Sequence, residues 1–358
     1  MQSARRDLWD NPMGTDGFEF VEYTGPDPAA LAELFERMGF VAAARHRSKN
    51  VTLYRQGDVN FILNAEPESF AQAFARLHGP SVCALAFRVA DAAKAYQRAI
   101  SLGAKPVHGK VGPMELNIPA IEGIGGSLIY LVDRYGERTI YDVDFTPLAA
   151  DMAAASGVGL ADIDHLTHNV HRGRMQLWAE FYERLFNFRE IRYFDIEGRL
   201  TGLRSKAMTS PDGRIRIPIN ESADDKSQIA EYLEAYHGEG IQHIALATAD
   251  IYASVEALRR RAISFMSVPD AYYEAVDARV PGHGEDLTRL RRDRILIDGA
   301  PAAGQGLLLQ IFTETVIGPI FFEIIQRKGN RGFGEGNFRA LFEAIERDQI
   351  RRGVLAST

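Results

Sequence analysis

The sequence lacks the residues that would cross-link it covalently or carry it into a membrane. Its single cysteine, Cys83, excludes a disulfide within the chain and a cysteine-rich zinc site, and suits a reducing compartment. No segment is apolar for long enough to span a bilayer, and the opening residues MQSARRDLWDNPMG lack the apolar core of a secretory signal. These absences predict a cytoplasmic protein that makes no membrane contact.

The sequence also has no excess of positive charge. It carries 48 Asp and Glu residues against 41 Lys and Arg residues, a formal net charge of −7 at pH 7, which argues against nucleic acid as the main partner. Hydrophobic residues make up 46% and charged residues 25% of the 358 positions, as in ordinary soluble proteins. A chain of this length can bury the cores of two domains.

What the sequence does contain is an internal duplication in which only one copy has potential metal ligands. The segment VCALAFRVAD aligns with IQHIALATAD, so that Ala84 corresponds to His243. Further on, SLIYLVDRYG aligns with IFFEIIQRKG, so that Tyr130 corresponds to Glu323. Packing gives no reason to place two metal-binding side chains at matched positions of one copy only. The duplication therefore predicts one metal site, in the second half of the chain.

A strand, a helix and further strands follow one another four times along the chain. Alternating apolar runs at 18–23 and 163–170 each precede a segment whose apolar residues recur at helical spacing. The two matched strands of the duplication are each followed by another helix. A polar, Ala-rich stretch at 148–160 has the composition of a linker. The pattern predicts an α+β protein with two domains, 1–150 and 151–358.

Four motifs in the second half point to a known family. In chain order they are DHLTHNV (164–170), GEGIQHIAL (238–246), LLLQIFTETVIGPIFFEIIQRKG (307–329) and GFGEGNFRALFEAIER (332–347). Together and in this order they resemble the bacterial type of 4-hydroxyphenylpyruvate dioxygenase, a family of the vicinal oxygen chelate superfamily. The resemblance covers nearly the whole chain, from NPMGTDGFEF onward.

The resemblance implies both a fold and a reaction. The fold would be four βαβββ modules paired into two open β-barrel domains of the glyoxalase/bleomycin-resistance/extradiol dioxygenase type, the first without metal and the second capped by the C-terminal helix. The reaction would convert 4-hydroxyphenylpyruvate and O2 to homogentisate and CO2 by oxidative decarboxylation, ring hydroxylation and side-chain migration, a step of tyrosine and phenylalanine catabolism. Fe(II) would be the cofactor, and the protein would form a homo-oligomer, either a dimer or a tetramer.

Three side chains are the predicted metal ligands: His165, His243 and Glu323. Two histidines and one carboxylate that leave open positions are typical of non-haem Fe(II) oxygenases, although these ligands also suit manganese, cobalt or zinc, so iron rests on the resemblance. His243 and Glu323 stand in apolar strands, where an unpaired imidazole or carboxylate would be costly to bury. The competing interpretation of Glu323 is a buried salt bridge to Arg327. His168 is predicted to point away from His165, to the opposite face of its strand.

The resemblance also implies the residues around the substrate. Those that would orient the phenol end are Ser205, Asn220 and Gln228, and those nearer the metal are Gln242 and Gln310. The walls and lid would be formed by Phe312, Phe333 and Phe338, of which the last two lie among the glycines of GFGEGNF and at the start of the final helix. Taken singly, each polar residue could equally be solvated, and each phenylalanine could be ordinary core.

Three other functions remain open at this stage. A 4-hydroxymandelate synthase would use the same substrate and metal and differ only in the carbon that is oxidised. A ring-cleaving extradiol dioxygenase would need a base near the metal, and the residues available, His237 and Tyr232, are predicted on a helix. A metal-free binding protein, like drug-sequestering relatives in the superfamily, would have no reason to carry all three ligands.

Overall fold

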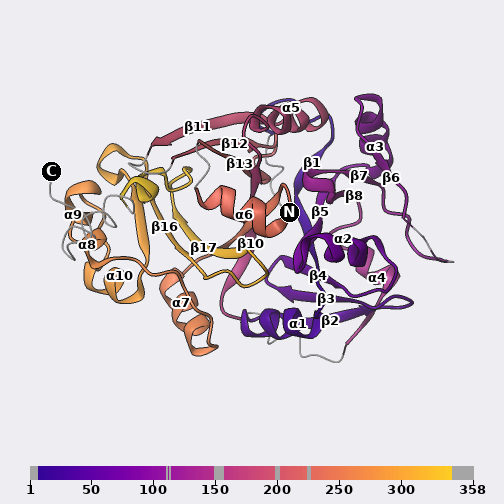
Figure 1. Cartoon of the computed structure of the whole chain (residues 1–358), viewed down its shortest axis with the longest axis horizontal. Helices are drawn as coiled ribbons and strands as arrows, with labels where there is room; N and C mark the ends of the chain where they lie inside the picture. The colour runs from indigo at the N-terminus through magenta and orange to yellow at the C-terminus, as the bar shows by residue number, and fades with distance from the viewer. Residues whose placement is uncertain are drawn as a thin grey trace.

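Two mixed β-sheets, one in each half of the chain, form the framework of the protein (Figure 1). The computed structural model describes residues 7–109, 112, 114–148, 157–197, 202–223 and 227–340. None of the described helices is long and apolar enough to cross a membrane.

The elements of the first half are, in order, β1 (Thr15–Thr24), α1 (Pro28–Arg37), β2 (Val41–His46), β3 (Val51–Gln56), β4 (Val59–Asn64), α2 (Phe70–His78), β5 (Ser81–Val89), α3 (Ala92–Ser101), β6 (Pro106–Val107), β7 (Ala120–Glu122), the short 3-10 helix η1 (Ile124–Gly126), β8 (Leu128–Val132), α4 (Ile140–Asp144) and β9 (Phe145–Pro147).

Those of the second half are β10 (Leu160–Val170), α5 (Met175–Phe186), β11 (Arg189–Glu197), β12 (Gly202–Thr209), β13 (Arg216–Ser222), α6 (Gln228–Tyr236), β14 (Gly240–Thr248), α7 (Ile251–Arg260), α8 (Asp270–Tyr273), α9 (Val276–Arg279), α10 (Leu287–Asp293), β15 (Leu296–Gly299), the short 3-10 helix η3 (Pro301–Ala303), β16 (Leu307–Phe312) and β17 (Phe321–Lys328).

The strand order confirms the four predicted modules. The first sheet runs β6-β7-β8-β5-β1-β4-β3-β2-β9, and the second runs β11-β12-β13-β10-β14-β17-β16-β15. In every module the first strand pairs in parallel with the last, as β1 with β4, β5 with β8, β10 with β13 and β14 with β17. Two modules join through antiparallel first strands, β1 with β5 and β10 with β14. Each half is therefore a pair of βαβββ modules with one continuous sheet.

Helix α1 shows how the local sequence produces these elements. The side chain of Asp27 accepts hydrogen bonds from the first backbone N–H groups of the helix, and Pro28 occupies the first helical position, where its missing N–H does not matter. Leu31, Leu34 and Phe35 form the buried face. The helix ends at Arg37, and after a turn of three residues the chain enters β2 at Val41.

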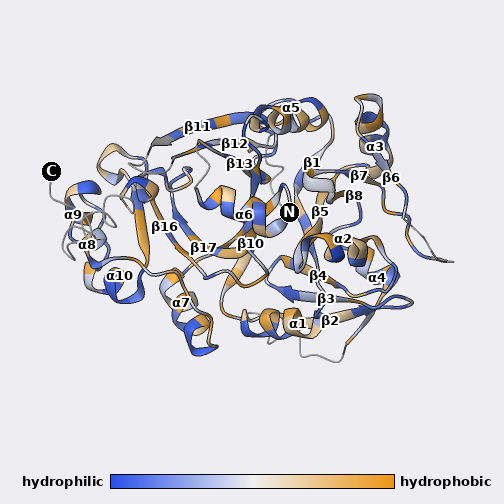
Figure 2. Ribbon diagram, viewed as in Figure 1, coloured by the Kyte–Doolittle hydropathy of each residue, from blue (hydrophilic) through white to orange (hydrophobic). Residues whose placement is uncertain are grey.

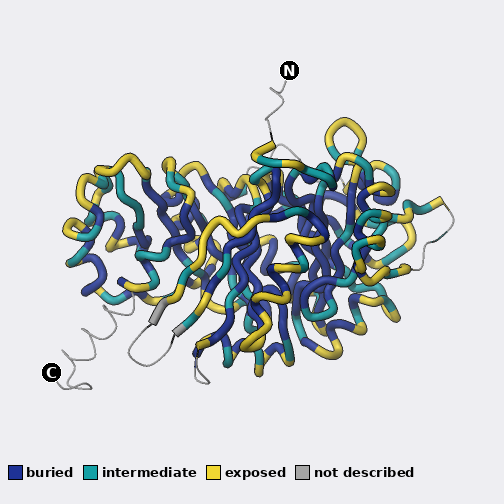
Figure 3. Tube along the Cα trace, turned by 90° about the horizontal axis from the view of Figure 1, so that it is seen from above, coloured by how far each residue is buried: buried dark blue, intermediate teal, exposed yellow. Residues whose placement is uncertain are grey.

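The two halves share one apolar core. Phe61 of β4 stacks on Phe322 of β17, with ring centroids 5.8 Å apart, and Phe87 of β5 meets Phe186 of α5 edge to face at 5.2 Å. Hydrophobic residues alternate with polar ones along helices such as α1 and α5 (Figure 2), and the buried residues gather in the middle of the molecule (Figure 3). The opposite faces of the two sheets are thereby left free of this core.

Two predicted segments are only partly within the described residues. Of the predicted linker, 149–156 lie outside the described part, and β10 already begins at Leu160, because Val158 donates its backbone N–H to the Gln56 side chain at 2.6 Å and anchors the chain there. Of the predicted C-terminal helix, the structure describes 335–340 as helical, and the later residues lie outside the described part.

Candidate metal centre

The three central strands of the second sheet bring the predicted ligands together. Across β10, β14 and β17 the pairing sets His165 beside Ala245 and Ala245 beside Glu323. Two residues farther along β10, Thr167 lies beside His243 of β14. Positions two apart on a strand share a face, so His165, His243 and Glu323 all project from one side of the sheet.

Their side-chain atoms converge closely enough to hold one ion. Nε2 of His165 lies 3.2 Å from Oε2 of Glu323, and Nε2 of His243 lies 3.4 Å from the same oxygen. One ligand atom from each residue falls within 4.8 Å of the others, and all three residues are buried. Within the described ranges no second group of three such residues occurs. Two imidazoles and a carboxylate in this arrangement fit a divalent transition metal.

Both histidines are held by the residue that precedes them. Immediately before each histidine the pairing of β10 with β14 slips by one residue, which leaves Asp164 and Gln242 as unpaired bulge residues. Asp164 Oδ1 lies 2.8 Å from Nδ1 of His165, and Gln242 Oε1 lies 3.0 Å from Nδ1 of His243. Each oxygen accepts the Nδ1 proton and leaves the Nε2 lone pair facing the site, as metal-binding histidines require.

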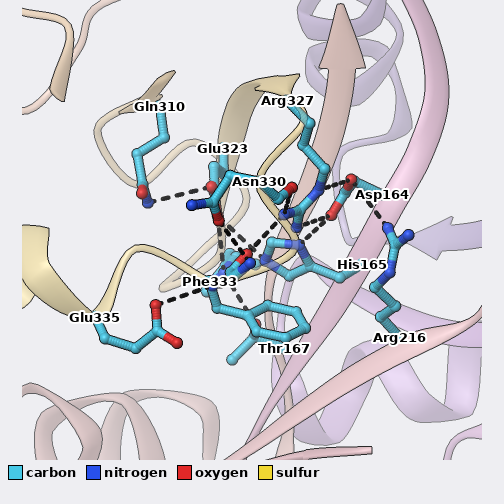
Figure 4. Close-up of polar contacts among 12 residues, drawn as sticks. Asp164, His165, Thr167, Arg216, Gln310, Glu323, Arg327, Asn330, Phe333 and Glu335 are labelled. Carbon is cyan, nitrogen blue, oxygen red and sulfur yellow. Dashed lines mark hydrogen bonds and ion pairs between the residues drawn. The ribbon is translucent and has the colours of Figure 1, made fainter. Parts of the chain in front are cut away.

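Asp164 is itself fixed by two arginines (Figure 4). Arg327 binds it through two parallel contacts, Nε to Oδ2 at 2.7 Å and Nη2 to Oδ1 at 2.8 Å, and Arg216 adds a contact of 3.2 Å. Burial would raise the pKa of Asp164, but the hydrogen bonds and charges of Arg327 and His165 outweigh it and hold this pKa well below its usual value. The salt bridge from Arg327 to Glu323, the alternative to metal binding, is not formed, because Arg327 is bound to Asp164.

The pKa values of the three ligands reflect their mutual contact. Burial would raise the pKa of Glu323, but the two histidines lower it below its usual value. Burial lowers the pKa of His243, whereas Glu323 and Asp164 raise the pKa of His165 against the effect of burial. The carboxylate is therefore charged, ready to bind a cation. Thr167 also reaches this point, with its hydroxyl 2.9 Å from Nε2 of His243.

The structure brings some of the predicted substrate residues to the ligands. Besides Gln242, Gln310 donates from Nε2 to Oε1 of Glu323 at 3.3 Å. Phe333 meets the ring of His165 edge to face at 5.4 Å, and Phe312 lies 6.2 Å from the ring of His243. Phe321, which the sequence did not single out, stacks flat on His243 at 4.9 Å. Aromatic rings thus surround the two imidazoles.

The remaining predicted residues lie farther along the sheet or at its edge. Ser205 and Asn220 are paired neighbours on β12 and β13, and Asn220 is also paired with Asn169 on β10. No hydrogen bond joins Ser205 or Asn220 to the three ligands in the part of the chain described. Gln228 is the first residue of α6, and its side chain is exposed. Phe338 is half-buried, and its backbone N–H donates to Gly334.

The first sheet shows the same positions without ligands. There the matched row is Phe20, Ala86 and Tyr130, and Ala84 takes the place of His243. Phe20 and Tyr130 contact each other at 5.6 Å, within an apolar cluster that fills this face. The strand register therefore supports the alignment of Ala84 with His243 and of Tyr130 with Glu323. It also identifies Phe20 as the counterpart of His165, which the sequence comparison had missed.

Comparison with known proteins gives one family for the whole chain. Residues 9–146 match the family model "Hydroxyphenylpyruvate dioxygenase, HPPD, N-terminal", and residues 162–276 match that of the "Glyoxalase/Bleomycin resistance protein/Dioxygenase superfamily". The chain is 65% identical to hemolysin VllY of Vibrio vulnificus, over 96% of this chain and 98% of the relative. It is 64% identical to a 4-hydroxyphenylpyruvate dioxygenase of Pseudomonas aeruginosa, over 96% and 97% of the two chains.

A solved structure adds a more distant likeness. A variant of 4-hydroxymandelate synthase from Streptomyces coelicolor superposes with a TM-score of 0.80 at 27% identity, covering 94% of this chain and all of that one. The much higher identity to proteins named 4-hydroxyphenylpyruvate dioxygenase favours that family over the synthase.

Proposed function

The chain belongs to the 4-hydroxyphenylpyruvate dioxygenase family, and on that premise we propose that it converts 4-hydroxyphenylpyruvate and O2 to homogentisate and CO2. One oxygen atom of O2 enters the carboxyl group of the product and the other enters the ring. The observation that carries the proposal is the buried convergence of His165, His243 and Glu323 in a chain of this family.

We propose Fe(II) as the metal, held by these three side chains. When bound there it would offer open positions to the keto acid and to O2 and would supply the electrons that activate O2. The protein's part is to hold its ligands in the right state. Asp164 and Gln242 keep the Nδ1 protons of His165 and His243, and Gln310 occupies the second oxygen of Glu323. No side chain has to act as a strong acid or base.

The spacing along β10 fits the length of the proposed substrate. Asn169 lies two residues beyond Thr167 and four beyond His165, which is about 7 to 13 Å along the strand. The row formed by Asn169, Asn220 and Ser205 crosses the sheet at that level. From the metal to its phenol oxygen, 4-hydroxyphenylpyruvate reaches about 9 Å by ordinary bond lengths. We therefore place the phenol at this row and the keto acid at the ligands.

The aromatic residues around the imidazoles would position the ring and exclude water. Phe321 and Phe312 pack against His243, and Phe333 packs against His165. Apolar rings at a site where a reactive oxidant forms limit side reactions with solvent. Phe338, four residues beyond Gly334, would continue this wall at the start of the final helix.

The test is reconstitution with Fe(II) under anaerobic conditions, followed by addition of 4-hydroxyphenylpyruvate and O2. We expect homogentisate, identified by chromatography and mass, with one CO2 released per molecule. Hydroxymandelate as the product would assign the chain to the synthase reaction instead. Oxygen consumption with neither product would refute the proposed substrate.

Other properties are proposed from the family and from the sequence. We infer a role in tyrosine and phenylalanine catabolism, a cytoplasmic location and a homo-oligomer, either dimer or tetramer. We also propose the division into a metal-less domain at 1–150 and a catalytic domain at 151–358, from the internal duplication of the sequence. Light scattering of the purified protein would measure the oligomeric state.

A further inference from the structure

A chain of hydrogen bonds connects the start of the C-terminal helix to the metal-binding carboxylate. We propose that Asn337 and Tyr272 are positioning residues for Glu323 and act on it through Gln310. The inference rests on the proposed role of Glu323 as a metal ligand. Within the described part of the chain, no hydrogen bond joins Asn337 or Tyr272 to the three metal ligands, so they would act by fixing the orientation of the Gln310 amide.

The chain is continuous and buried. Tyr272 donates its hydroxyl proton to Oδ1 of Asn337 at 2.5 Å, and Nδ2 of Asn337 donates to Oε1 of Gln310 at 3.0 Å. Nε2 of Gln310 then donates to Oε1 of Glu323 at 3.3 Å. The four residues are at most 2% exposed, so water has little access to replace any of these bonds.

The direction of the chain is set at its outer end by Arg279, a side chain that can only donate. Arg279 Nη2 donates to the Tyr272 hydroxyl at 2.7 Å and to the Ile297 carbonyl at 2.8 Å. The backbone N–H of Ile297 donates to the same hydroxyl at 2.9 Å. The Tyr272 hydroxyl also lies 3.1 Å from the Ile297 carbonyl, but Oδ1 of Asn337, at 2.5 Å, is the closer acceptor, so the Tyr272 proton goes to Asn337.

Every later orientation follows from that one. Because Oδ1 of Asn337 faces Tyr272, its amide nitrogen must face Gln310, and the Gln310 nitrogen must then face Glu323. The chain ends at a carboxylate, which can only accept while it is charged. With Oε1 of Glu323 bound to Gln310, its Oε2 faces the Nε2 atoms of both histidines. Arg279, which can only donate, thus fixes the orientation of the Glu323 carboxylate, which can only accept, through Tyr272 and the amides of Asn337 and Gln310.

The decisive variant is Asn337→Asp, which keeps the size of the side chain and removes its donor. The new carboxylate still accepts from Tyr272 but repels Oε1 of Gln310. The Gln310 amide is then expected to turn over, donate to the new carboxylate and present its own oxygen to Glu323. We expect Co(II) affinity to fall 10-fold to 100-fold, the range found when groups that orient metal ligands are lost.

The added negative charge by itself would raise the Co(II) affinity of Asn337→Asp, so a fall in affinity identifies the loss of the donor as its cause. An added negative charge near the site attracts a divalent cation. Asn330→Asp is the matched control, because it puts the same charge on the neighbouring segment while its Oδ1 continues to accept from Gly332 N–H. We expect the control to bind Co(II) within twofold of the unchanged protein, or slightly more tightly.

Tyr272→Phe provides a second, uncharged perturbation. It removes the group that orients Asn337 and leaves the two amides free to turn together, so the expected loss of Co(II) affinity is severalfold. Co(II) titration followed by visible absorption measures the site without substrate or turnover. Steady-state kinetics of the Fe(II) enzyme should then show a fall in kcat larger than the change in KM, because the row of Asn169, Asn220 and Ser205, where the phenol is proposed to bind, is unaltered.

The outcomes separate this inference from the proposed function. Weaker Co(II) binding in Asn337→Asp and Tyr272→Phe, with the control unchanged, supports the relay. Unchanged affinity in folded Tyr272→Phe overturns it, whether or not Asn337→Asp folds. If the unchanged protein itself binds no Co(II) and forms no homogentisate, the proposed function fails and the relay, which rests on it, is overturned as well; Co(II) binding that is equal in all variants overturns the relay alone.

Discussion

Removing Arg327 should weaken both the fold and the metal site, and the structure allows the size of the effect to be worked out. Arg327→Met keeps most of the length of the side chain and deletes two contacts to Asp164, at 2.7 and 2.8 Å. Loss of one partner of a buried ion pair costs about 3–5 kcal/mol. Arg216 remains 3.2 Å from the same carboxylate, so we expect the lower end, about 3 kcal/mol.

Urea unfolding of the metal-free protein measures this change. Arg216→Met is the matched control, because Arg216 makes a single longer contact to Asp164 and its side chain is 28% exposed; its removal should cost about 1 kcal/mol or less. Asp164→Asn in the Arg327→Met background completes a double-mutant cycle that isolates the pair. Metal affinity of Arg327→Met should fall about 10-fold or more, since Asp164 orients His165.

The loss of stability in Arg327→Met should also depend on pH in a defined direction. The pKa of Asp164 lies well below its usual value of 3.8, so the pair stabilises the fold above that pH and is lost as the pH falls through the folded-state pKa. The difference between the unchanged protein and Arg327→Met should therefore be constant from pH 8 to 5 and shrink at lower pH. A loss under 1 kcal/mol at neutral pH, or one that grows on acidification, would refute this account of Asp164.

Three further predictions concern single positions. Glu323→Ala should abolish homogentisate formation without lowering the urea midpoint of the metal-free protein; a retained product peak would disprove its role as a ligand. Tyr130→Ala should lower the free energy of unfolding by about 2–3 kcal/mol through the lost contact with Phe20, while turnover per folded molecule stays the same; lost turnover would count against a structural role. Burial lowers the pKa of His168 to about 3 from 6.5, so the unfolded chain takes up the proton first and stability falls below pH 6.5, by about 2 kcal/mol at pH 5; His168→Gln should remove this slope in urea titrations at several pH values.

The duplication made part of the site predictable from the sequence alone. His243 and Glu323 stand out because the matched segments carry Ala84 and Tyr130, and alignment compares chemistry directly. His165 came only from the family motif, because its counterpart Phe20 lies in a segment with no visible similarity. The strand register supplies that correspondence, and it needs the pairing of strands that are far apart in the sequence.

What the sequence could not provide were the contacts that cross between elements. From the sequence, Arg327 is a candidate partner of Glu323, four residues away on the same strand, but in the structure it binds Asp164 on another strand. The bulges at Asp164 and Gln242 were also unpredicted, since a slip in pairing has no signature in one strand alone. In the sequence, Asn337 is one polar residue in a glycine-rich motif, and only the fold shows that it joins Tyr272 to Gln310.

The bulges reveal which part of the site belongs to the fold and which to the three ligands. The first sheet has slips at the same places, where Glu19 and Cys83 are the unpaired residues that correspond to Asp164 and Gln242. Glu19 even keeps an arginine partner, Arg88, at 2.5 Å. The backbone that aims two histidines in one copy is therefore present in the other, where apolar side chains fill the same face. Metal binding in this chain thus depends on side chains placed on a backbone geometry that both copies retain.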